Sequence, residues 1–301
     1  MAEVLAGTLS EVGRIQRVVL KHARDAFGGP ETIAREWRAL GFTAPPNFWR
    51  ALEEYDAFAE LIASTGARID WLPAAPGADL DSIYVRDASI VAPSGLILSR
   101  MGKPMREAEP AAQAEAFGAW QLPLHGAIAS PGLLEGGDIV WLDPHTLIAG
   151  RGYRTNDDGI RQLEGLVGPD VRVIAVPLPH WRGPGDVFHL MSVVSPIDRD
   201  LAVVYSPLLP VPFLELLVER GIQLVEVPDD EFRTMGANVL ALSPRRCLMV
   251  DGNRRTRARL EQAGVEVLVY EGREISLKGG GGPTCLTRPI QREWGNEAMG
   301  Q

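Results

Sequence analysis

Residues 138–149 read DIVWLDPHTLIA, and this stretch decides the fold because its pattern occurs five times along the chain. A polar residue leads a short apolar strand, a proline-containing turn follows, and a second apolar strand returns. The related stretches are DASIVAPSGLIL (87–98), HLMSVVSPIDRDLAVV (189–204), NVLALSPRRCLMV (238–250) and, without its return strand, CLTRPI (285–290). The leading residues are 51, 51, 49 and 47 positions apart, and such a constant interval indicates an internal repeat.

Each repeat also contains a helical segment and a further strand. Helical patterns cover 156–167, 212–220 and 254–263, and the apolar runs at 171–176, 222–227 and 265–270 follow them. The repeating unit is therefore strand, strand, helix, strand. Units of this kind can close a ring, as in propellers, and equivalent positions of every unit then meet at the central axis.

The residues that lead the five repeats would meet at that axis. They are Asp87, Asp138, His189, Asn238 and Cys285. A repeat built only for packing would place valine or leucine there, whereas four of these five residue types carry out chemistry. Any one of them taken alone is better interpreted as a turn or strand-edge residue facing solvent, but the set of five is not.

Bulk properties narrow the class of protein. A chain of 301 residues with 46% hydrophobic residues can bury a core without disulfides or metal. Its net charge of −9 argues against nucleic acid or an anionic membrane as partner, so a small molecule fits better. No apolar run is long enough to span a membrane and no secretion signal is evident, so we expect the cytoplasm, where Cys247 and Cys285 remain thiols.

Five motifs in this order resemble the guanidine-modifying superfamily, which has the pentein fold and includes dimethylarginine dimethylaminohydrolase, arginine deiminase and the amidinotransferases. The motifs are DSIYVRD (81–87), LEGGD (134–138), GYRTN (152–156), HLMS (189–192) and GGGGPTCLT (279–287). The resemblance implies an α/β fold, a five-bladed β/α propeller with pseudo-fivefold symmetry. It further implies a single catalytic domain over residues 1–301, with a core at about 13–292 and a frayed tail at 293–301.

The resemblance also assigns catalytic roles. It makes Cys285 the nucleophile, His189 the general acid and base, and Glu135 the carboxylate that orients His189. A thiolate suits attack on a resonance-stabilised guanidinium carbon, and a histidine is the best-tuned proton donor to the leaving amine near neutral pH. The run Gly279–Gly282 would allow close backbone approach and tight turning beside the nucleophile, with a flexible loop as the alternative.

Four further residues are expected to bind substrate. The resemblance places Asp87 on the guanidinium nitrogens and Asp81 at a second substrate-binding aspartate. Arg106 and Arg154 fall where relatives that take amino acids hold the substrate carboxylate, with a position on the surface as the alternative for both. No metal or other cofactor is implied, since no two histidines have the short helical spacing of a zinc site.

Two positions depart from the family patterns. Met191 stands where arginine deiminases carry an aspartate, and Arg86 stands where dimethylarginine dimethylaminohydrolases tend to carry an acid. A methionine there removes a negative partner, which favours an N-substituted or less basic substrate over plain arginine. We expect a Cys-dependent hydrolase of guanidino C–N bonds, with an amidinotransferase or a non-catalytic binding propeller as alternatives, and a homodimer as a fair expectation.

Overall fold

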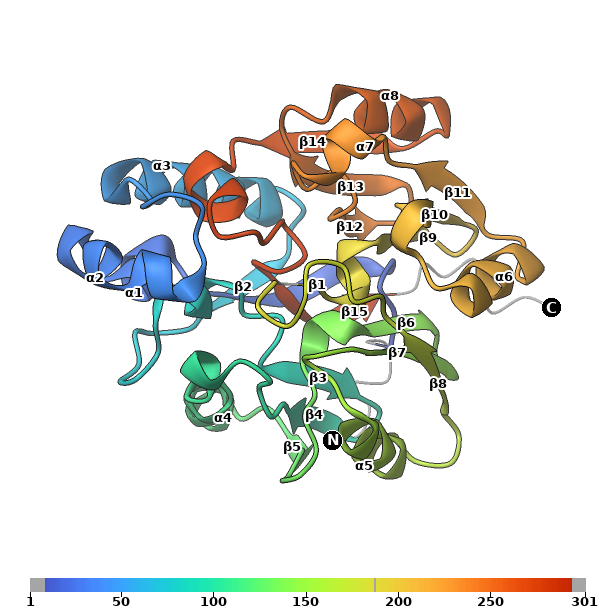
Figure 1. Ribbon diagram of the computed structural model, residues 1–301, viewed down its shortest axis with the longest axis horizontal. Coiled ribbons are helices and arrows are strands. Elements are labelled where there is room, and N and C mark those ends of the chain that lie inside the picture. Colours follow the sequence, from blue (N-terminus) through green and yellow to red (C-terminus); the bar gives the residue numbers. More distant parts are fainter. Residues whose placement is uncertain (1–8, 187, 294–301) are drawn as a thin grey trace.

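Five small sheets stand around a common centre in the computed structural model, which describes residues 9–186 and 188–293 (Figure 1). Each sheet has three strands, in the orders β3-β4-β5, β6-β7-β8, β9-β10-β11, β12-β13-β14 and β15-β1-β2. The strands are β1 (Arg14–Leu20), β2 (Arg68–Trp71), β3 (Ser89–Ala92), β4 (Gly95–Leu98), β5 (Leu124–Ala127), β6 (Ile139–Asp143), β7 (Thr146–Arg151), β8 (Arg172–Pro177), β9 (Val194–Asp198), β10 (Leu201–Val204), β11 (Gln223–Glu226), β12 (Leu240–Ser243), β13 (Arg246–Val250), β14 (Glu266–Tyr270) and β15 (Arg288–Glu293).

The pairing within each blade matches the predicted unit of strand, strand, helix, strand. In the four blades built from consecutive strands, the first two strands pair antiparallel across a tight turn, and the third pairs parallel to the second. A parallel neighbour requires a crossover, which the helices supply on the outside of the ring (Figure 1). The α-helices are α1 (Ala23–Phe27), α2 (Pro30–Leu40), α3 (Phe48–Ala63), α4 (Glu109–Ala119), α5 (Asp157–Val167), α6 (Val211–Glu219), α7 (Asp229–Phe232) and α8 (Arg254–Gln262).

The fifth blade explains why the last repeat lacks its return strand. Strand β15 from the C-terminal end pairs antiparallel with β1 from the N-terminal end, and β1 pairs parallel with β2. The two ends of the chain therefore complete one blade together and close the ring. Glu293, assigned to the frayed tail from the sequence, is the last residue of β15, and residues 294–301 lie outside the described residues.

The hydrophobic core is divided into five clusters, and each cluster joins two neighbouring blades. For example, Ile90 and Ile97 of one blade pack with Trp141 and Leu147 of the next. The fifth cluster joins Val19 and Ile290 of the closing blade back to the first. Five interfaces between five blades confirm the predicted five-bladed propeller, because an open array would leave one blade face without a partner.

Short helical turns contain or flank two of the five predicted axial residues. They are the 3-10 helices η2 (Leu80–Ile83), η3 (Pro104–Arg106), η4 (Gly136–Asp138), η5 (Leu190–Ser192) and η6 (Ser206–Leu208), together with the π-helix η7 (Arg273–Leu277). Asp138 ends η4, and His189 is the N-cap residue of η5. Within the described ranges, no helix is long and apolar enough to cross a membrane.

Candidate active site

Cys285 lies in the loop between η7 and β15, where glycines let the backbone pass close to neighbouring side chains. A Cβ atom on Gly281 would lie 2.3 Å from the Tyr84 ring, and one on Gly282 would lie 2.5 Å from Asn238 Oδ1. The close approach predicted for this run is thus confirmed. Asn238 Oδ1 accepts the Thr284 amide at 3.0 Å, and its Nδ2 donates to Cys285 Sγ at 3.3 Å. One side chain therefore fixes both the loop and the sulfur.

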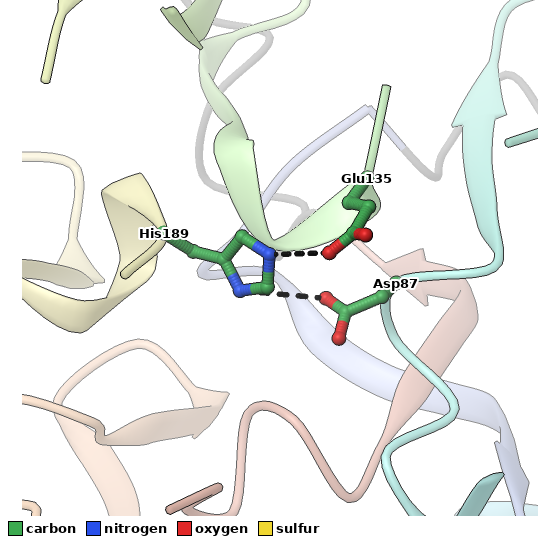
Figure 2. A group of neighbouring side chains, drawn as sticks. All are labelled: Asp87, Glu135 and His189. Atoms are coloured by element: carbon green, nitrogen blue, oxygen red, sulfur yellow. Dashed lines mark hydrogen bonds and ion pairs between the residues drawn. The ribbon is translucent and has the colours of Figure 1, made fainter. Parts of the chain in front are cut away.

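His189 lies between two carboxylates, as Figure 2 shows. Its Nε2 is 2.7 Å from Glu135 Oε2, and its Nδ1 is 3.8 Å from Asp87 Oδ1. The turn at Gly137 makes this possible, because a Cβ atom there would lie 2.6 Å from His189 Nδ1 and 2.7 Å from Asp87 Oδ1. The LEGGD motif thus forms a tight turn and also leaves the space that the imidazole occupies.

Glu135 is completely buried and nevertheless ionised. Burial alone would raise its pKa, but the hydrogen bond and charge of His189, together with the charge of Arg154, hold the pKa of this carboxyl far below its usual range. Its Oε1 also accepts the amides of Gly102 at 2.8 Å and Lys103 at 3.2 Å. A fixed negative charge at this place stabilises a protonated imidazole and fixes its orientation.

The protonation states of His189 and Cys285 follow from this environment. Burial opposes the charged imidazole, but Asp87, Asp138 and the hydrogen bond that the imidazole donates to Glu135 outweigh it and raise the pKa of His189 to about 9. Burial and the charge of Asp87 raise the pKa of Cys285 to about 11, although the Asn238 hydrogen bond lowers it in part. Near pH 7 the site without substrate therefore contains an imidazolium and a neutral thiol.

Asp87 belongs to a buried network with Arg106. The guanidinium donates from Nη1 to Asp87 Oδ2 at 2.6 Å, from Nη2 to the Tyr84 carbonyl at 2.9 Å, and in bidentate fashion to Glu109 at 2.7 and 2.8 Å. Arg106 is only 4% exposed. The other oxygen of Asp87, Oδ1, is buried without a hydrogen-bond partner among the described residues. That oxygen is free to accept a hydrogen bond from a cationic ligand.

Two cavities meet at the sulfur and the imidazole. A polar cavity of about 20 Å³ is bordered by Asp81, Asp87, Lys103, Arg106, Arg154, His189 and Cys285. A larger cavity of about 180 Å³ also has His189 and Cys285 in its wall, together with Met191. The predicted residues thus come together around one centre, with Glu135 behind His189. Asp81 is paired with the Lys103 ammonium, which also donates to the Leu40 carbonyl.

Sequence reasoning gave Asn238 and Asp138 no defined role. Asn238 led the fourth repeat, so the repeat itself was the signal that could have identified it. Asp138 accepts the Thr155 hydroxyl at 2.6 Å and the Leu190 amide at 3.0 Å, and burial raises its pKa to about 6. Asp138 therefore joins η4 to η5. Nothing in the motifs indicated Lys103 or Glu109.

Asp87, Glu135 and His189 also meet the distance requirement of a metal site, since one ligand atom from each lies within 4.8 Å of the others. Both carboxylates already face a buried guanidinium, Arg106 on Asp87 and Arg154 on Glu135. These fixed positive charges oppose a divalent cation. His189 Nε2 is also already bonded to Glu135, so this group of side chains fits acid–base work better than it fits a metal ion.

Comparison with known proteins agrees with the geometry. The arginine deiminase family matches residues 81–214 and 209–292. The chain is 32% identical to the N(G),N(G)-dimethylarginine dimethylaminohydrolase of Streptomyces coelicolor over 79% of this chain and 84% of that one. It is 30% identical to the arginine deiminase of Mycobacterium avium over 53% of this chain and 46% of that one. The dimethylarginine dimethylaminohydrolase structure from Pseudomonas aeruginosa with citrulline has a TM-score of 0.72, with 20% identity over 93% of this chain and 99% of that chain.

The fold and the matches define one class of protein, the guanidine-modifying superfamily with the pentein fold. Within it, the chain belongs to the arginine deiminase family.

Proposed function

We propose that this protein is a hydrolase that cleaves a C–N bond of a guanidino compound through a covalent thiouronium intermediate on Cys285. The observation that carries the proposal is that Cys285 and His189 border the same two cavities, with Glu135 bonded to the imidazole from behind. The named relatives, a dimethylarginine dimethylaminohydrolase and an arginine deiminase, support the same class of reaction.

Binding of the substrate would prepare the nucleophile. A guanidinium beside Asp87 Oδ1 would satisfy that buried, unpartnered oxygen and place a positive charge next to the sulfur. Because a neighbouring positive charge favours the thiolate, the pKa of Cys285 falls from about 11 and its proton leaves to solvent. The neutral thiol of the free site is thus converted to a thiolate when the cation arrives.

The first half of the reaction forms the S–C bond and breaks the C–N bond. The thiolate adds to the guanidinium carbon, the imidazolium of His189 gives its proton to the departing amine, and the amine leaves. His189 is then neutral. In the second half it takes a proton from water, the oxygen adds to the same carbon, and the S–C bond breaks to release a ureido product.

The roles of the four expected substrate-binding residues remain predictions. Their contacts in the structure favour some of these roles over others. Asp81 borders the polar cavity but is paired with Lys103, so it would bind a cation only by exchanging that partner. Arg106 donates to Glu109, Asp87 and a carbonyl, which suits holding Asp87 in place better than binding a ligand carboxylate. Arg154 contacts Glu135 at 3.3 Å and retains donors for a ligand. A cytoplasmic location and a homodimer also stay predictions.

Turnover of a panel of compounds tests the proposal. The panel contains arginine, methylated arginines, agmatine and guanidino acids, each assayed for ureido product and released amine. We expect ureido product from wild type and none from Cys285→Ser, whereas Cys247→Ala, which alters the buried second thiol, should remain active. A new guanidino product formed only when a second amine is added would replace the hydrolase by an amidinotransferase. No product from any compound, together with a Cys285 that a haloacetamidine does not label, would favour a binding protein.

A further inference from the structure

The two cavities at Cys285 differ greatly in capacity. A buried water requires roughly 10–15 Å³ of cavity volume. The polar cavity, at about 20 Å³, therefore has room for one or two waters, while the larger cavity, at about 180 Å³, has room for on the order of a dozen. Of these two, the larger cavity alone can hold the carbon chain of a guanidino compound as the structure stands.

The inner wall of the larger cavity is apolar and well supported. Phe188, which precedes His189 in sequence, and Met191, which follows it by two residues and is only 3% exposed, both line this cavity. Phe232 is stacked on Tyr205, with ring centroids 3.9 Å apart, and the edge of Trp181 packs against it at 6.0 Å. A wall of this kind favours methylene groups over a second charge close to the guanidinium.

Positive charge collects on the outer part of the same cavity. Arg182 and Arg233 are exposed residues in its wall, and Asp186 is the single acid among its lining residues. The Arg182 guanidinium lies over the Trp181 ring at 5.3 Å. Neither guanidinium makes a hydrogen bond or ion pair with any residue in the part of the chain that the structure describes. Two arginines with free donors beside an apolar chamber suit a carboxylate.

We propose that the substrate is an ω-guanidino acid whose carbon chain lies in the larger cavity and whose carboxylate is bound by Arg182 and Arg233. The assignment rests on the proposed function. The polar cavity then receives the departing nitrogen, because its volume fits ammonia or a small amine. This arrangement places the carboxylate on the opposite side of Cys285 from Arg106 and Arg154, whose nearest carboxylates are Asp87, Glu109 and Glu135.

The reaction balances in this orientation. For a chain R, Cys285 sulfur bonds to the central carbon of R–NH–C(NH₂)=NH₂⁺, the bond to the unsubstituted nitrogen breaks, and His189 protonates that nitrogen as it enters the polar cavity. Water then supplies the oxygen and its two protons. The products are R–NH–CO–NH₂ and ammonium, with the carboxylate of R unchanged.

A matched pair of ligands tests the site. 4-Guanidinobutanoate carries the carboxylate on an apolar chain, and agmatine carries an ammonium in a similar place. Their dissociation constants are measured by calorimetry on Cys285→Ser, alone and combined with Arg182→Ala, Arg233→Ala or the control Arg172→Ala, an exposed arginine on β8. We expect each cavity variant to weaken 4-guanidinobutanoate about 10-fold, agmatine less than about 2-fold, and the control to change neither.

The outcomes separate this inference from the proposed function. Turnover by the wild type with unchanged binding in both arginine variants would refute the inference and keep the hydrolase. Binding that depends on Arg182 and Arg233 without any turnover would keep the site and remove the hydrolase. If 4-guanidinobutanoate does not bind Cys285→Ser, or binds no better than agmatine, the carboxylate site is wrong.

Discussion

Replacing Glu135 by glutamine tests the electrostatic design of the site most directly. Oε1 accepts two backbone amides, from Gly102 at 2.8 Å and Lys103 at 3.2 Å, and Oε2 faces His189 Nε2 at 2.7 Å. A glutamine must keep its oxygen toward the two amides, so its NH₂ group would face the imidazole. The ring nitrogen that donates in the wild type would then have to accept, which favours neutral histidine.

The size of the effect follows from the hydrogen bond that is lost. A hydrogen bond to a charged group contributes about 1.5–3 kcal/mol, and about 1.4 kcal/mol corresponds to one pH unit in a pKa. The pKa of His189, about 9 in the wild type, should therefore fall to about 7 or 8 in Glu135→Gln. Asp87 and Asp138 remain and keep it above the value of free histidine.

The assay is an NMR titration of the His189 ring, with the pH profile of kcat/KM beside it. The first half of the proposed reaction needs the imidazolium, so the loss of activity at high pH should begin one to two pH units earlier in the variant, as the two energies imply. Glu164→Gln, an exposed change on α5, serves as the control and should alter neither. A His189 pKa that stays at about 9 in Glu135→Gln would refute the reasoning.

Three further predictions concern the thiol, the turn and the core. Because the pKa of Cys285 is raised to about 11, the rate of its alkylation by neutral iodoacetamide should keep rising up to about pH 11. A cationic haloacetamidine should instead label the thiol readily at pH 7. An iodoacetamide rate that stops rising below pH 8 would contradict this prediction. Gly137→Ala should lower kcat about 100-fold or more, because the added Cβ atom would displace His189. The control is Gly118→Ala in α4, where a Cβ atom would meet nothing within 4 Å. This control should keep activity and raise the free energy of unfolding, measured with denaturant, by up to about 1 kcal/mol. Burial raises the pKa of Glu54 to about 7, so the folded state favours the protonated carboxyl and stability falls as pH rises from about 4.5 to 7. Glu54→Gln should therefore raise the free energy of unfolding at pH 8 by up to about 3 kcal/mol and leave it little changed at pH 4. Equal effects of the substitution at pH 8 and pH 4 would be inconsistent with this sign.

The fold was predictable because it repeats. Each blade uses the same order of elements, and the predicted helices at 156–167, 212–220 and 254–263 became α5, α6 and α8 within one or two residues at each end. The closing blade was not predicted, because its strands come from opposite ends of the chain. Pairing of β1 with β15 is a contact between residues such as Val19 and Arg288, and local periodicity carries no information about such distant contacts.

The candidate site was predictable to the extent that its residues were in register with the repeat or in a motif. Cys285, His189 and Asp87 satisfied that condition, and all three border the polar cavity. Glu109 did not, because it lies on a helix with no repeat position, and its importance follows only from its bidentate contact with Arg106. A residue whose role is to neutralise another buried charge leaves no periodic signal in sequence.

The same limit explains why the place that we propose for a substrate carboxylate differs from the place expected from the sequence. An arginine at a family position has a donor geometry that fits any carboxylate, whether it belongs to a ligand or to the protein. Here the chain supplies its own acids to Arg106, while the guanidinium groups of Arg182 and Arg233, which belong to no motif, have no hydrogen-bond partner among the described residues and border the larger cavity. Which arginines remain unpaired is a property of packing. The direction in which a substrate lies across Cys285 is therefore decided by the three-dimensional arrangement of charges, and the motifs alone leave it open.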